Sequence, residues 1–170
     1  MKILNSLIRY YPAIGGVEDY VKNLSELLVK KGHDISVITS NSAVHQRYEK
    51  LDTVFKEHIR GVYVSRHRPC ALSFKKYLLI PGMLPDICMR EVDIIHGHSY
   101  MYCSADSALL ASKIKRKPFV FTPYLSGINN PSFFGRAYRK IFGNALFNAD
   151  CVIVISPYEN QLVHDWGFRP

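Results

Sequence analysis

Two adjacent glycines before the first amphipathic segment form a candidate binding feature. Gly15 and Gly16 lie in the turn at residues 12–18, between an apolar run and a segment with apolar residues at steps of three and four. A residue without a Cβ lets a ligand approach closely, and the first N–H groups of a helix have no acceptor within it. The turn is therefore a candidate phosphate-binding site, and an ordinary tight strand-to-helix turn is the alternative.

Two histidines alternate along a segment that is expected to be a strand. His96 and His98 are two positions apart, so both side chains project from the same face. A metal pair would need a clear third ligand, which the sequence does not offer, so we predict no metal site. A polar group facing a ligand at the strand end fits His98, and a hydrogen-bonded core histidine is the simplest interpretation of His96.

The elements that would position these residues alternate between strands and helices. Strands are expected at residues 3–8, 34–40, 53–59, 62–66, 92–98, 118–124 and 151–155, the last buried on both faces because it has few polar residues. Helices are expected at residues 17–31, 74–80, 84–91, 104–114, 134–147 and 157–166. This alternation predicts an α/β fold with a Rossmann-like, doubly wound, mostly parallel sheet and helices on both faces.

In such a sheet, ligands bind at the carboxyl ends of the strands. Those ends carry the glycine pair and a group of polar residues, namely Arg66, His98, Ser99, Thr122, Tyr124, Ser126 and Ser156. The gathering of polar side chains at one edge is stronger support for a binding site than any one of them.

Composition limits the class of protein. A length of 170 residues suits one domain, and a hydrophobic content of 48% supports a sizeable core. The four scattered cysteines form no CxxC pair, which favours free thiols in a reducing compartment. No apolar run approaches the roughly 18 residues of a membrane span, and we find no secretion signal, so we predict a cytoplasmic protein.

The formal net charge of +8 indicates an anionic partner: nucleotide phosphates, anionic lipid or nucleic acid. No nucleic-acid motif is present, so we do not expect nucleic acid. Residues 70–91, which include Lys75, combine apolar and basic residues around an interruption at Pro81 and Gly82. Such a segment can rest on an anionic membrane surface, and a helix packed on the sheet is the alternative.

Three familiar motifs are absent. The glycine turn lacks the GxGxxG pattern, and the second strand ends in Ile38, Thr39 and Ser40 rather than an acid, which argues against a dinucleotide site. The chain has neither GxxxxGK[ST] nor GxSxG, so a P-loop and a nucleophile elbow are both excluded.

Four segments, in this order, resemble the start of family-4 glycosyltransferases, which are two-domain enzymes of the GT-B type. The first is Gly15-Gly16-Val17-Glu18 opening a helix, followed by residues 30–39. The second, at residues 93–98, is similar to that family's DxxHxH segment. Residues 117–123 and 149–156 resemble the family's later strands, so the resemblance runs over essentially the whole chain.

This resemblance implies transfer of a sugar from a nucleotide-sugar donor to an acceptor, with retention and without a metal or another cofactor. It implies that Gly15 and Gly16 approach the donor diphosphate. The family often has a histidine where this chain has Tyr124, and a tyrosine can hydrogen-bond a sugar hydroxyl but cannot act as an imidazole base. No catalytic residue is certain, and His98 and Tyr124 are the candidates. The candidates for acceptor contacts are Arg66, His98, Ser99, Thr122, Tyr124 and Ser126.

Family members also carry a second Rossmann-like domain that holds the nucleotide. We therefore expect residues 1–170 to be a single acceptor-side domain that lacks the C-terminal donor-binding domain and is inactive alone. The expected partners are a nucleotide-sugar, a sugar or lipid-linked acceptor and the missing domain. The alternative hypothesis is a non-catalytic module that docks on an anionic membrane, such as the inner face of the cell membrane, or on a partner subunit.

Overall fold

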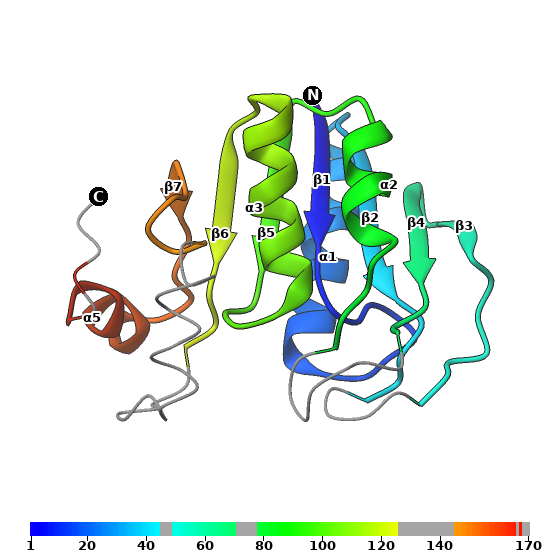
Figure 1. Cartoon of the computed structure of the whole chain (residues 1–170), viewed down its shortest axis with the longest axis horizontal. Coiled ribbons are helices and arrows are strands. Elements are labelled where there is room, and N and C mark those ends of the chain that lie inside the picture. Colours follow the sequence, from blue (N-terminus) through cyan, green and yellow to red (C-terminus); the bar gives the residue numbers. More distant parts are fainter. Residues whose placement is uncertain (45–48, 71–77, 126–144, 166, 168–170) are drawn as a thin grey trace.

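A single twisted sheet organises the chain (Figure 1). The computed structural model describes residues 1–44, 49–70, 78–125, 145–165 and 167. In this part of the chain, seven strands follow the order β3-β4-β2-β1-β5-β6-β7. All neighbours pair in parallel except β3 and β4, which form an antiparallel hairpin. The strands are β1 (Lys2–Ser6), β2 (Asp34–Ser40), β3 (Lys56–Ile59), β4 (Val62–His67), β5 (Ile94–His98), β6 (Phe119–Thr122) and β7 (Cys151–Val152).

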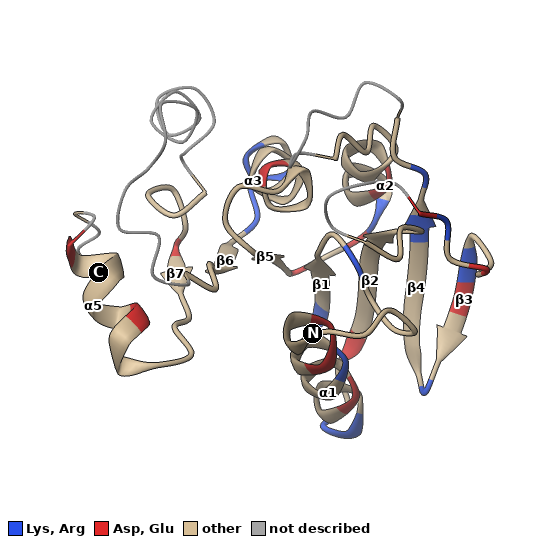
Figure 2. Ribbon diagram, turned by 90° about the horizontal axis from the view of Figure 1, so that it is seen from below, with Lys and Arg blue, Asp and Glu red and all other residues tan. Residues whose placement is uncertain are grey.

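Helices cover both faces of the sheet (Figure 2). The longest described helix, α1 (Gly16–Lys30), lies on one face, and α2 (Met83–Met89) and α3 (Cys103–Lys115) lie on the other. Helix α5 (Pro157–Asp165) lies beyond β7 at the end of the sheet. The predicted doubly wound, mostly parallel Rossmann-like fold is confirmed. None of the described helices is long and apolar enough to cross a membrane.

The alternation of side chains along the central strand divides the core into two layers. On β1, Leu4 belongs to the cluster that packs against α2 and α3, and Ile3 belongs to the cluster that packs against α1. Gly97 on β5 admits a close neighbour, because a Cβ there would lie 2.9 Å from the Phe119 ring. The apolar character of the central strands thus follows from burial on both sides.

The first helix ends at Lys30, one residue before its predicted end. Gly32, just after the C-cap of α1, has φ +83°, a conformation that glycine adopts without a Cβ clash. Helix α5 begins with a side-chain cap, because the Glu159 N–H donates to Ser156 Oγ at 3.1 Å.

The structure corrects several predicted elements. Strand β1 ends at Ser6, although Leu7 and Ile8 are buried as expected. The run at residues 151–155 is wrong as a strand buried on both faces: β7 has two residues, Cys151 is exposed, and Ile153 and Ile155 are 36% and 56% exposed. The physical reason is position, because β7 is the last strand and pairs only with β6.

Two predicted helices fall largely outside the described residues. Of residues 74–80, only 78–80 are described, and they are not helical. Of residues 134–147, only 145–147 are described, and they form a turn. The basic segment near Lys75, on which the membrane-docking alternative depended, therefore lies outside the described part of the chain.

Candidate functional site

The glycine turn joins β1 to α1 and gives its two glycines different surroundings. Gly15 is the N-cap of α1, and a Cβ there would collide with the Glu18 carboxylate and lie 3.1 Å from an Arg9 nitrogen. Gly16 is the first residue of α1, and a Cβ there would meet none of the described residues within 4 Å. The close approach of Glu18 therefore explains Gly15, whereas packing within the described chain does not require a glycine at position 16.

A buried ion pair lies directly beneath this turn. Glu18 is 2% exposed, and its Oε1 lies 2.7 Å from Arg9 Nη2. Arg9 also donates from Nη1 to the Ala43 carbonyl at 2.7 Å. Since Glu18 neutralises Arg9, attraction of an anion to the turn depends on the start of the α1 backbone. The sequence analysis missed Arg9. A basic residue after the first strand, followed by the acidic Glu18 in the first turn of the next helix, was the signal that could have indicated this ion pair.

The start of α1 presents N–H groups that precede the helical hydrogen-bond ladder. The Asp19 N–H makes the first helical bond, to the Gly15 carbonyl at 2.9 Å. The N–H groups of Gly16 and Val17 come before it, at the positive end of the helix dipole.

Two histidines from β5 meet the residues that end β6. His96 and His98 project from the same face as predicted, with ring centroids 3.9 Å apart. His96 Nε2 lies 2.8 Å from Thr122 Oγ1, and His98 Nδ1 lies 3.3 Å from the Tyr124 hydroxyl. The Tyr124 ring also packs edge-on against Tyr20, with ring centroids 5.9 Å apart. This contact connects the cluster to α1, the helix that follows the glycine turn.

Burial keeps these groups uncharged near neutral pH. It lowers the pKa of His96 from 6.5 to about 4, and burial together with the nearby His96 lowers the pKa of His98 well below its usual range. Burial, followed by the neighbouring Tyr20, Glu159 and Glu18, raises the pKa of Tyr124. The cluster is therefore a neutral, mostly buried hydrogen-bonded group and provides neither an imidazolium nor a phenolate at pH 7.

The backbone at these strand ends is strained. Ser99, Met101 and Tyr124 have φ values of +70°, +65° and +52°, which side-chain-bearing residues rarely adopt. The Ser99 N–H donates to the Thr122 carbonyl at 2.9 Å, so the two loops brace each other. Such strain persists only where the surroundings enforce it and is concentrated at functional sites.

A buried carboxylate enforces the conformation after Tyr124. Glu159 of α5 is 1% exposed, and its two oxygens accept the N–H groups of Leu125 and Ile155, each at 2.7 Å. The sequence analysis placed Glu159 only within the helix expected at residues 157–166. Its second bond, to a residue 34 positions earlier, has no local sequence signal.

The structure brings some predicted site residues together and leaves others apart. His98, Ser99, Thr122 and Tyr124 meet at the ends of β5 and β6. Arg66 lies on β4, separated from β5 by β2 and β1, and is 2% exposed. Ser126 lies outside the described residues.

The buried guanidinium of Arg66 is used within the chain. It pairs with Glu57 through Nη1 and donates from Nη2 to the Tyr11 carbonyl at 2.6 Å. Arg66 thereby anchors the beginning of the glycine turn to β4. A role for Arg66 in acceptor binding stays a prediction.

A third histidine, His67, lies in a separate cluster that the sequence analysis missed. His67 Nε2 lies 2.8 Å from Asp86 Oδ2 and 3.4 Å from Ser65 Oγ. Both neighbours face the same ring nitrogen, so these residues cannot relay a proton as a nucleophilic triad does. Burial alone would raise the pKa of Asp86, but hydrogen bonds from His67 and Ser65 and the nearby Arg90 lower it to about 2. The cluster ties β4 to α2.

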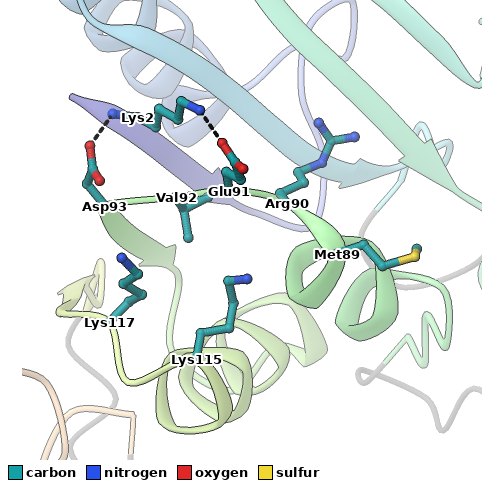
Figure 3. Close-up of a pocket in the computed structure, with 8 residues that line it drawn as sticks. All are labelled: Lys2, Met89, Arg90, Glu91, Val92, Asp93, Lys115 and Lys117. Atoms are coloured by element: carbon teal, nitrogen blue, oxygen red, sulfur yellow. Dashed lines mark hydrogen bonds and ion pairs between the residues drawn. The ribbon is translucent and has the colours of Figure 1, made fainter.

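A pocket of about 410 Å³ lies at the opposite edge of the sheet (Figure 3). Lys2 closes one side, donating from its backbone to Asp93 Oδ2 at 2.8 Å and pairing through its ammonium with Glu91. Lys115 and Lys117 line the other side. This pocket is at the amino ends of the strands, so it is separate from the histidine cluster. Among the described residues, no group of three or more His, Cys, Asp or Glu side chains could hold a metal ion.

Comparison with known sequences decides the family. The sequence profile of Glycosyltransferase Family 4 matches residues 14–170, which include the glycine pair and the histidine cluster. The chain belongs to glycosyltransferase family 4. The family-4 match, the topology and the fold comparison below together identify the chain as a Rossmann-like domain of the GT-B fold.

Curated relatives of this family-4 domain include two eukaryotic proteins. One of them, a human phosphatidylinositol N-acetylglucosaminyltransferase subunit, is 29% identical over 116 residues, which cover 68% of this chain and 23% of the human protein. The phosphatidylinositol N-acetylglucosaminyltransferase GPI3 subunit of Saccharomyces cerevisiae is 27% identical over 164 residues, covering 91% of this chain and 34% of the yeast protein. The aligned part of the chain thus spans about a third or less of the length of these relatives.

A solved structure shares the fold of the family-4 domain. The sucrose-phosphate synthase of Thermosynechococcus elongatus superposes with a TM-score of 0.56 at 17% identity, over 97% of this chain and 44% of that one. At this identity the likeness concerns the fold alone.

Proposed function

We propose that this domain is the acceptor-side half of a glycosyltransferase that moves a sugar from a nucleotide-sugar donor to an acceptor, with retention and without a metal. The named relatives support N-acetylglucosamine as the sugar and phosphatidylinositol as the acceptor. Their description as subunits supports a partner subunit, and a lipid acceptor would bring the protein to a membrane surface.

The observation that carries this proposal is the open position of Gly16. Among the described residues, no atom would lie within 4 Å of a Cβ at position 16, so the first residue of this helix has room for a ligand. The adjacent N–H groups and the helix dipole favour an anion there, as the donor diphosphate would be. The Tyr124 hydroxyl, at the partly buried end of this neutral cluster, suits a hydrogen bond to a sugar or acceptor hydroxyl.

A size series at position 16 tests this role. Gly16→Ala, Gly16→Val and Gly16→Trp would be made in the complete two-domain protein, and transfer from a radiolabelled nucleotide-sugar measured. We expect activity to fall as the side chain grows while the unfolding midpoint stays close to that of the wild type, because the position is open. Wild-type turnover by Gly16→Trp would remove the diphosphate-binding role.

The isolated domain provides a second test. Donor affinity and closure around both substrates would depend on the second domain, so the chain of 170 residues should show no transfer. Turnover by this chain alone would show that the proposed two-domain arrangement is wrong.

A further inference from the structure

A series of hydrogen bonds connects Ser25 of α1 to Tyr124, which follows the carboxyl end of β6. Ser25 of α1, Asn5 of β1 and His98 of β5 are each 0% exposed. Asn5 Nδ2 donates to Ser25 Oγ at 3.2 Å, Asn5 Oδ1 lies 3.1 Å from His98 Nε2, and His98 Nδ1 lies 3.3 Å from the Tyr124 hydroxyl. Nothing in the sequence pattern singled out Asn5 or Ser25.

The donor and acceptor properties of these groups determine which atom donates in each of these hydrogen bonds. Since the Asn5 amide nitrogen donates to Ser25, its oxygen faces His98, and an amide oxygen can only accept. His98 must then carry its proton on Nε2, which leaves Nδ1 as an acceptor. The proton of the Tyr124 hydroxyl is therefore directed inward to Nδ1, and the lone pairs of the phenol oxygen remain available.

We propose that Asn5 is a positioning residue that acts through His98, fixing the imidazole tautomer so that Tyr124 accepts a hydrogen bond from a ligand and does not donate one. The ligand group selected at this position is a hydroxyl that can donate its proton. Its identity as a sugar or acceptor hydroxyl rests on the proposed function, whereas the tautomer depends only on this chain.

The tautomer can be measured directly on the chain of 170 residues. Two-bond proton–nitrogen NMR correlations of ¹⁵N-labelled histidine distinguish a protonated ring nitrogen from an unprotonated one. We expect His98 in the wild type to be protonated at Nε2. In Asn5→Leu, a buried Nε2–H would have no acceptor, so we expect the proton to move to Nδ1, where Tyr124 can accept it.

Ser25→Ala is a milder second variant, in case Asn5→Leu does not fold. It removes the acceptor that orients the Asn5 amide, so we expect a rise in the Nδ1-protonated form. Protonation at Nδ1 in the wild type, or an unchanged tautomer in the variants that fold, would overturn the proposal.

The functional consequence is tested in the complete protein with fluorinated substrates. Replacing a hydroxyl by fluorine removes its proton, so nucleotide-sugars and acceptors fluorinated at one position at a time locate the selected hydroxyl. We expect one such analogue to lose about tenfold in kcat/KM with the wild type and distinctly less with Asn5→Leu. Equal loss in both proteins would overturn the selection by Asn5. Absence of any transfer by the wild type would overturn the proposed function instead, with the NMR result still deciding the tautomer.

Discussion

Moderate acidification should destabilise this domain through the two buried histidines of β5, His96 and His98. Burial lowers the pKa of His96 from 6.5 to about 4, and it lowers that of His98 in the same direction. Between pH 6.5 and about pH 4, His96 binds a proton in the unfolded chain but not in the native state. The stability that neutral His96 contributes is therefore present above pH 6.5 and is lost as the pH falls toward 4.

The size of the effect follows from the difference between the two pKa values. A gap of about 2.5 units corresponds to roughly 3 kcal/mol of unfolding free energy for His96 over the full range. About half of it, ~1.5 kcal/mol, is lost between pH 6.5 and 5. His98 adds to the loss with the same sign. Asp86, whose pKa falls from 3.8 to about 2, contributes only at lower pH, so this interval isolates the histidines.

Urea denaturation at pH 6.5 and pH 5 measures this difference. His96→Gln removes the titrating ring and should lessen the pH-dependent loss by ~1.5 kcal/mol relative to the wild type. His164→Gln, which changes an exposed histidine of α5, is the matched control and should keep the wild-type pH dependence. Equal pH dependence in the wild type and His96→Gln would refute the reasoning.

Three further predictions concern stability and are checked by chemical denaturation. Gly15→Ala should lower the free energy of unfolding by about 1–3 kcal/mol, because the new methyl group would collide with the buried Glu18 carboxylate. Gly16→Ala should be neutral or stabilising by up to ~1 kcal/mol. Equal effects of the two substitutions would contradict the different surroundings of the two glycines. Thr39→Val should be neutral or stabilising, since the buried Thr39 hydroxyl has no hydrogen-bond partner among the described residues. Thr122→Val should cost about 1 kcal/mol by depriving His96 of its partner, and a reversed order would be inconsistent with the hydrogen bonds. Glu159→Gln should cost about 1–3 kcal/mol, because one amide oxygen cannot replace both carboxylate oxygens, and an unchanged stability would mean that the two bonds are dispensable.

The sequence was sufficient for the order of the elements, because periodicity is a local property. Segments around Leu4 and Val37 are rich in buried apolar residues, as expected for strands covered on both faces, and α1 ends at Lys30, one residue before its predicted end. The run at Ile153 and Ile155 was misinterpreted for the same reason: its composition permits burial, but only the strand order shows that β7 is the last strand of the sheet.

The candidate site was predictable only in part. The rule that polar residues gather at the carboxyl ends of parallel strands brought His98 and Tyr124 together correctly in space. The rule could not anticipate Asn5, whose contact with His98 joins residues 93 positions apart. Nor could it show that Arg66 at the end of β4 is enclosed by the hairpin and the glycine turn, because a strand-end position gives no information about burial.

The central position of β1 has a consequence for synthesis on the ribosome. β1 pairs with β2, which ends at Ser40, and with β5, which ends at His98. The 58 residues between these points take roughly 3 to 12 s to add at about 5–20 residues per second. During that interval one edge of the strand that will form the middle of the sheet is open to other chains. Nascent-chain lengths between these two points should therefore be the stage at which the domain depends most on chaperones.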